Sequence, residues 1–184
     1  MWQPLPAPEE CIIQIAVPLA AMSIEQIVLP EGVQKEDAYK ALLPQLKALL
    51  GDEKNVVACT ANLVAALKEA FGFYWIGLYF VYAEEKELVL GPFQGPPACI
   101  RIPFGKGVCG TAWKKREAII VPDVQLFSGH IACSPHTKSE IVVPVWKGED
   151  VKAVIDIDST ELSFFDDVDK RYLIKIAEII SPLL

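Results

Sequence analysis

The hydrophobic pattern predicts helices toward both ends of the chain. Segments 37–51 and 55–72 carry apolar residues at the spacing of amphipathic helices, and each ends on a glycine suited to a C-cap. Pro44 interrupts the first segment, so we expect either a kink or a helix that begins there. Segment 166–184 predicts a closing amphipathic helix, whose acidic first turn is favoured by the helix dipole.

Strand-like runs fill the middle of the chain. They cover residues 73–83, 86–93, 98–104 and 118–124. A short helix is predicted over 107–117, and segment 139–159 is typical of a hairpin that turns at 147–150. We therefore predict an α+β domain layered α/β/α, in which a central antiparallel sheet of about five or six strands is flanked by N- and C-terminal helices.

Composition indicates a folded protein and limits the classes of partner that it is expected to bind. The 184 residues are 52% hydrophobic and 22% charged, which suits one domain with an appendage. A net charge of −7 without a long basic run argues against nucleic acid and favours a cationic or zwitterionic small ligand. The apolar run 11–22 follows acids and is too short to span a bilayer, so we expect neither a signal peptide nor a membrane contact.

Residues 1–36 are predicted to form a separate arm of unknown role, because five prolines punctuate them. Such an arm lies either on the domain or across a partner subunit, which leaves a homodimer possible. The odd count of five cysteines argues against a secreted disulfide scaffold and predicts a cytoplasmic, reducing location. Cys11 and Cys59 have apolar neighbours, and we expect both to be inert packing residues.

Three cysteines, Cys99, Cys109 and Cys133, lie in a stretch dense in glycine and proline. Cys109 is near the start of the predicted helix 107–117, where N-terminal amides would favour its thiolate. Cys133 has a histidine three residues to either side. It is therefore an incidental loop residue, a zinc ligand, or a nucleophile that afterwards forms a disulfide with Cys99 or Cys109.

Carboxylates in the predicted hairpin form a second candidate cluster. Asp156 and Asp158 are two residues apart, so both point to one sheet face, with apolar neighbours such as Val154 expected partly on the other. That face is either exposed or an acidic wall that Glu140 completes. In a wall, mutual repulsion raises at least one pKa and creates a proton donor near neutral pH. Trp75 is either a core aromatic or one wall of a pocket.

Three stretches of the chain, 91–113, 122–146 and 153–159, together resemble the free methionine-(R)-sulfoxide reductases, which are GAF-domain enzymes. The motifs SGHIAC, SEIVVP and DIDS and the contexts of three cysteines carry the resemblance. It extends over about residues 37–184 and leaves the N-terminal arm outside. The resemblance implies a GAF-like catalytic domain that reduces free L-methionine-(R)-sulfoxide under oxidative stress, without a metal or other cofactor.

The resemblance also implies roles for individual residues. Cys133 corresponds to the nucleophile, and Cys99 or Cys109 to the thiol that resolves it. The implied substrate-binding residues are Trp75, against the substrate methyl, with Glu140, Asp156 and Asp158. Pro97 and Ser134 depart from the family pattern, where a basic and an acidic residue are common.

Reduction of a sulfoxide requires the cysteine and carboxylic acid side chains that these motifs supply. A protonated acid helps the sulfoxide oxygen leave, and thiolate attack leaves a sulfenic acid on Cys133. A second thiol converts it to a disulfide, which a reductant such as thioredoxin opens. Carboxylates facing the ammonium group would select the free amino acid over a peptide-bound residue.

The main alternative is a non-catalytic GAF ligand-binding or redox-sensing module, although such modules usually sit in longer chains. A zinc-stabilised interaction domain is a third possibility.

Overall fold

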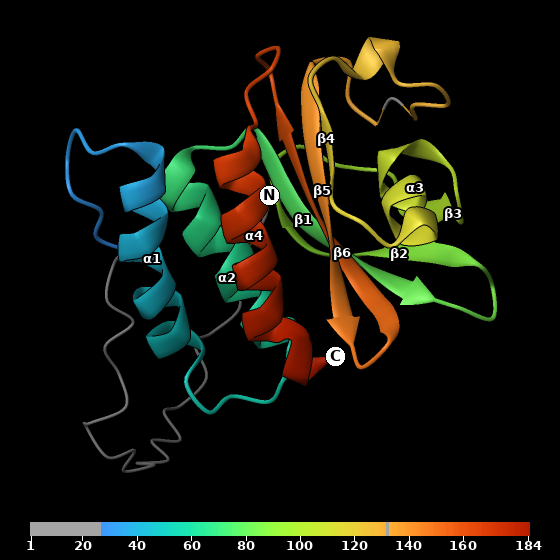
Figure 1. Cartoon of the computed structure of the whole chain (residues 1–184). Helices are drawn as coiled ribbons and strands as arrows, with labels where there is room; N and C mark the ends of the chain where they lie inside the picture. The colour runs from blue at the N-terminus through green and yellow to red at the C-terminus, as the bar shows by residue number, and fades with distance from the viewer. Residues whose placement is uncertain (1–26, 132) are drawn as a thin grey trace, which may run out of the picture.

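Six strands form one antiparallel sheet in the computed structural model, which describes residues 27–131 and 133–184 (Figure 1). The strands are β1 (Trp75–Tyr82), β2 (Glu87–Gln94), β3 (Arg101–Pro103), β4 (Ile119–Val121), β5 (Ser139–Lys147) and β6 (Asp150–Ser159). Their order across the sheet is β3-β2-β1-β6-β5-β4, so the long strands occupy its middle. The edge strands β3 and β4 are shorter than predicted. Cys11 and most of the predicted arm lie outside the described residues.

The helices lie on both faces of the sheet (Figure 1). They are α1 (Lys35–Leu50), α2 (Val56–Phe71), α3 (Gly107–Lys115) and α4 (Asp167–Ile180). On one face α2 and α4 cover the sheet and α1 packs against both of them, while α3 covers the opposite face. Each face has its own hydrophobic core cluster. The predicted α+β, layered architecture is confirmed.

Helix α1 runs through Pro44, so the alternative of a helix that starts at this proline is wrong. Leu42 and Leu46 are fully buried on either side of it. Burial of this apolar face stabilises the helix more than the missing proline N–H weakens it, because tertiary packing supplies most helical stability. The predicted glycine C-caps are confirmed at Gly51 and Gly72, which both have positive φ.

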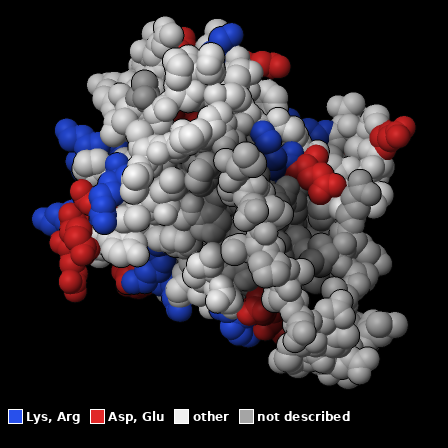
Figure 2. Space-filling model, turned by 180° about the vertical axis from the view of Figure 1, so that it is seen from behind, with Lys and Arg blue, Asp and Glu red and all other residues white. Residues whose placement is uncertain are grey.

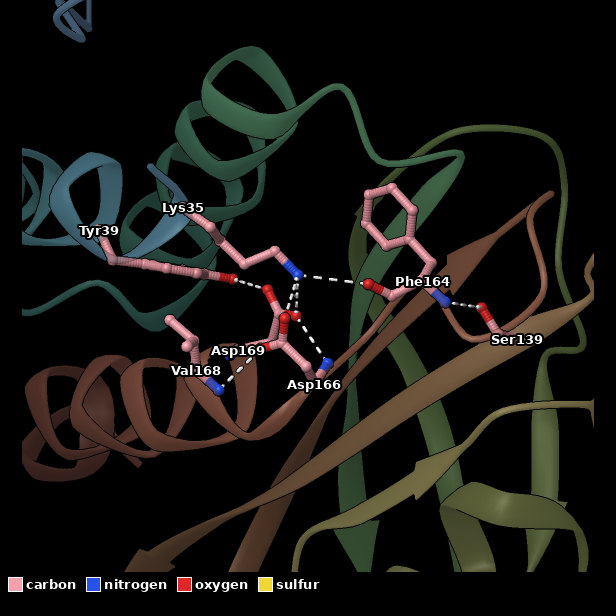
Figure 3. A network of polar contacts seen from close by, with 7 residues as sticks. All are labelled: Lys35, Tyr39, Ser139, Phe164, Asp166, Val168 and Asp169. Carbon is pink, nitrogen blue, oxygen red and sulfur yellow. Dashed lines mark hydrogen bonds and ion pairs between the residues drawn. The ribbon is translucent and has the colours of Figure 1, made fainter. Parts of the chain in front are cut away.

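A buried polar network joins α1 to the start of α4 (Figure 3). The Asp169 carboxylate, 1% exposed, accepts hydrogen bonds from the Tyr39 hydroxyl at 2.9 Å and from the Lys35 ammonium at 2.6 Å. It also accepts one from the Asp166 backbone N–H at 2.9 Å. Asp166 in return caps α4 by accepting from the Val168 N–H at 2.7 Å. The network therefore fixes the position of α1 against α4.

We expect Asp169→Ala to lower the free energy of unfolding by about 3 kcal/mol, because it leaves a buried hydroxyl unpaired and removes an ion-pair partner. Urea unfolding followed by tryptophan fluorescence would measure the change. Lys40→Ala is the matched control, since it removes only the exposed ion pairs of Lys40 with Glu36 and Asp37. Similar shifts of the unfolding midpoint in both variants would contradict the stabilising role of the network.

The surface carries charges of both signs. On the face seen from behind, Lys and Arg side chains are scattered among Asp and Glu (Figure 2). Within residues 27–131 and 133–184, no helix has the length and apolar character required to cross a bilayer.

Candidate active site

The central strands bring the three predicted carboxylates together on one face of the sheet. Glu140 on β5 lies opposite Asp158 on β6, and Asp156 is two residues before Asp158. Because cross-strand partners and alternate residues share a face, all three lie on the α3 side. Glu140 and Asp156 are each 6% exposed. The alternative of an exposed acidic sheet face is therefore wrong, and the acids form a partly to fully buried wall.

Val154 lies on the same face as the acids, contrary to the expectation that it points partly away. It is fully buried in the core cluster beneath α3. Ile155 and Ile157 instead enter the core on the α2 and α4 side. The physical reason is the two-residue period of a strand, which places Val154 with Asp156.

A disulfide joins Cys99 to Cys133, with 5.6 Å between the Cα atoms. Cys99 precedes β3, and Cys133 lies in the loop before β5, 34 residues later. Both are partly exposed, whereas Cys109 is a buried free thiol. Of the two thiols expected within reach of Cys133, the structure pairs Cys99 with it. A zinc site centred on Cys133 is not formed in this oxidised state.

Cys109 is a neutral thiol rather than the expected thiolate. It lies on α3, is 2% exposed, and has its Sγ 4.0 Å from Glu140 Oε1. Burial raises the pKa of this thiol well above its usual value, and the charges of Asp156 and Glu140 raise it further. These effects outweigh the helix N-terminal amides on which the expectation rested.

Burial also raises the pKa of each of the three acids. The pKa of Asp156 rises to about 6, although its polar contacts with Cys109 and Glu140 oppose the shift. Burial, followed by the charges of Asp156 and Asp158, raises the pKa of Glu140 well above its usual value. Burial and the Asp156 charge do the same to the pKa of Asp158. The wall therefore holds protons at neutral pH, as a proton donor must.

A cavity lies between the acids and the disulfide. Its volume is 40 Å³, which is room for a few water molecules at about 10–15 Å³ each. The chemistry-bearing side chains that line it are Trp75, Tyr79, Cys109, His130, Cys133, Glu140, Asp156 and Asp158. Pro97 and Ser134, the two departures from the family pattern, line it as well. The structure thus brings every predicted site residue except Cys99 to the cavity lining, and Cys99 is bonded to Cys133, which does line it.

Trp75 is both a core aromatic and a wall of the cavity. It is 4% exposed, and its ring centroid lies 6.1 Å from that of Tyr79 and 5.6 Å from that of Phe93. The indole N–H donates to the Pro96 carbonyl at 3.0 Å. Gly77 leaves space for the ring, because a Cβ there would touch the ring and lie 2.7 Å from Phe93 Cβ. The two alternatives for Trp75 are therefore compatible.

Two lining residues were missed by the sequence reasoning. Tyr79 donates its hydroxyl hydrogen bond to the Cys99 carbonyl at 3.0 Å. It lies four residues after Trp75 on β1, so strand alternation would have placed it on the same face. The sequence predicted His130 to be either an incidental loop residue or a zinc ligand beside Cys133, whereas its Nδ1 lies 3.9 Å from Glu140 Oε2.

Ser139 fixes the start of β5 beside Glu140 (Figure 3). Its hydroxyl donates to the Glu161 carbonyl at 2.7 Å and accepts from the Phe164 N–H at 3.4 Å. The Phe164 carbonyl in turn accepts from the Lys35 ammonium at 3.2 Å. The polar network between α1 and α4 therefore continues to the strand that carries Glu140.

Comparison with known proteins gives consistent matches over most of the chain. A GAF domain family model matches residues 54–184. The chain is 51% identical to GAF domain-containing protein A of Dictyostelium discoideum, over 85% of this chain and 98% of that protein. It is 43% identical to the free methionine-R-sulfoxide reductase of Saccharomyces cerevisiae, over 82% of this chain and 87% of that protein.

A solved structure shows the same fold. It is the free methionine-R-sulfoxide reductase from Neisseria meningitidis in complex with its substrate. The two chains superpose with a TM-score of 0.82 at 46% sequence identity, covering 85% of this chain and 95% of that one.

Proposed function

Because the chain belongs to the GAF-domain family of free methionine-(R)-sulfoxide reductases, we propose that it reduces free L-methionine-(R)-sulfoxide to methionine with its own thiols. One observation carries the proposal: a cysteine disulfide and a wall of proton-bearing acids border the same cavity. Sulfoxide reduction needs a sulfur nucleophile and a proton donor at one point, and this cavity supplies both.

Cys133 is the proposed nucleophile. In the reduced protein its thiolate attacks the substrate sulfur while an acid protonates the sulfoxide oxygen, which releases methionine and leaves a sulfenic acid on Cys133. The Cys99 thiol then condenses with the sulfenic acid, releasing water and forming the disulfide. The Cys99–Cys133 bond supports this assignment over Cys109, whose thiol is buried and neutral. A dithiol reductant such as thioredoxin would restore both thiols.

The acids divide into two roles in this proposal. Glu140 and Asp158, whose pKa values are raised well above normal, retain protons and can serve the sulfoxide oxygen. Asp156, with a pKa of about 6, is mostly ionised at pH 7 and faces the substrate ammonium. Trp75 packs on the substrate methyl. A peptide-bound residue has no free ammonium, so an ionised Asp156 selects the free amino acid.

Three further expectations stay proposals. The first is the division into an arm, 1–36, and a catalytic domain, 37–184, although α1 already begins at Lys35. The other two are a cytoplasmic location and a homodimer that uses the arm.

A substrate comparison tests the proposed function. The reduced protein is incubated with dithiothreitol and one of three substrates: the free R epimer, the free S epimer, or an R-epimer residue within a peptide. We expect turnover of the free R epimer and about 100-fold or more slower turnover of the peptide form, since a buried carboxylate left without its cation is costly. Equal rates with the peptide form would contradict ammonium selection. No turnover of any substrate would favour the non-catalytic ligand-binding module.

A further inference from the structure

Side-chain atoms on the buried side of the cavity have the spacing of metal ligands. Cys109 Sγ, one oxygen of Glu140 and one oxygen of Asp156 all lie within 4.8 Å of one another. In a tetrahedral zinc site, with Zn–S about 2.3 Å and Zn–O about 2.0–2.2 Å, neighbouring ligand atoms are roughly 3.3–3.6 Å apart. Side-chain shifts of about 1 Å would therefore close these three atoms around one ion.

Unpaired polar atoms point to a ligand at the same place. Asp156 Oδ1 belongs to a residue only 6% exposed and has no hydrogen-bond partner among the described residues. The Nδ1 of His130 is also buried without such a partner, 3.9 Å from Glu140 Oε2. Buried polar atoms without partners are costly. A cation held by Cys109, Glu140 and Asp156 would satisfy the Asp156 oxygen, whereas the His130 ring, which lies beside Glu140, would need a side-chain shift to reach the same ion. Burial lowers the pKa of His130, so its neutral ring has a lone pair for a metal.

The cavity has acidic groups but no cation of its own. Among the described residues that line it, none is a Lys or Arg, whereas three are carboxylic acids. The lining therefore offers no Lys or Arg to pair with an ionised carboxylate, and a bound cation could fill that role. The substrate ammonium and a divalent cation would both be attracted to the Asp156 carboxylate, so the two would exclude each other.

We propose that Cys109, Glu140 and Asp156, with the neighbouring His130 moving in as the fourth ligand, form a binding site for a thiophilic divalent cation of the zinc class. One sulfur, one nitrogen and two oxygen ligands suit Zn²⁺ and disfavour Mg²⁺ and Ca²⁺, which prefer oxygen alone. On binding, Cys109 and the protonated acid release protons to solvent and form metal bonds, with no electron transfer. The site uses the thiol that the Cys99–Cys133 disulfide leaves free, so it is present in the oxidised protein.

Cobalt(II) is a suitable probe, because it takes zinc sites and reports sulfur ligation by its absorption. Untagged protein carrying the Cys99–Cys133 disulfide is titrated with Co²⁺. We expect a sulfur-to-cobalt charge-transfer band and intense visible bands of tetrahedral geometry, both removed by added Zn²⁺. The band should disappear in Cys109→Ser and persist in Cys59→Ser, which alters a buried thiol in α2 away from the acids. A band that survives Cys109→Ser, or no band in the unaltered protein, would overturn the proposal.

His130→Gln provides a second variant, since this side chain is 17% exposed and its loss removes no described hydrogen bond of the ring. It should keep the charge-transfer band, change the visible bands and weaken Zn²⁺ binding by about tenfold or more. Unchanged visible bands and affinity would exclude His130 from the site.

Competition with an amino acid tests the link to the proposed function, on which this part of the inference rests. Free methionine carries the substrate ammonium and should lower the Co²⁺ occupancy more than alanine at the same concentration, because both chelate Co²⁺ in solution but only methionine has the substrate side chain. Cobalt binding that methionine lowers no more than alanine does would contradict a shared site. A protein that binds Co²⁺ through Cys109 but turns over no sulfoxide would contradict the reductase proposal and leave the metal site standing.

Discussion

Replacing Cys133 with serine is expected to lower turnover of free methionine-(R)-sulfoxide by about 10⁴-fold or more. A serine hydroxyl stays protonated at neutral pH and cannot form the sulfenic acid that carries the oxygen away from the substrate. Chromatographic measurement of methionine, with dithiothreitol as the reductant, gives the rate. The variant should fold normally, because Cys133 is partly exposed and lies in a loop.

Three other cysteine variants show whether the loss of turnover in Cys133→Ser reflects the proposed role of Cys133. Cys99→Ser should form methionine in an initial burst but fail to turn over with thioredoxin, because no disulfide forms for that reductant to open. Cys109→Ser should still form the Cys99–Cys133 disulfide, and Cys59→Ser should keep full activity. If Cys133→Ser were active and Cys109→Ser inactive, the nucleophile would be Cys109.

Glu140→Gln is expected to lower kcat by about 10²–10³-fold, because the amide has no acidic proton to give to the departing oxygen. In the unaltered protein, turnover should fall as pH rises through the pKa values of the acids, which burial raises. A kcat profile from pH 5 to pH 9 would show this decline. A kcat that is unchanged in Glu140→Gln would exclude Glu140 as the proton donor.

The same substitution should change how stability depends on pH. Burial raises the pKa of Glu140 in the folded protein above its value in the unfolded chain, so the folded form binds the proton more tightly. Ionisation of Glu140 therefore lowers the free energy of unfolding increasingly as pH rises above the pKa that this group has in the unfolded chain. At low pH, where the group is protonated in both states, this destabilisation is absent. Glu140→Gln should raise Tm more at pH 8 than at pH 5. Glu117→Gln, at an exposed surface position, is the control, and an equal Tm change at both pH values in Glu140→Gln would contradict this prediction.

Local periodicity was sufficient for most of the fold. The hairpin expected to turn at 147–150 has β5 ending at Lys147 and β6 beginning at Asp150. The two-residue period placed Asp156 and Asp158 on one face, and the same rule, applied consistently, would have placed Val154 and found Tyr79. Family motifs led to the prediction of roles for Cys99, Cys109 and Cys133, because those motifs are contiguous in the chain. Features that depend on residues close together in the sequence could thus be predicted without the structure.

What only the tertiary structure decided depends on contacts between distant segments. Residues 34 positions apart form the disulfide, so no local pattern could choose between Cys99 and Cys109 as the partner of Cys133. Whether the acidic face was exposed or buried depended on α3 packing over it. That packing removes water from Glu140 and Cys109, and the loss of solvation is what keeps their protons in place.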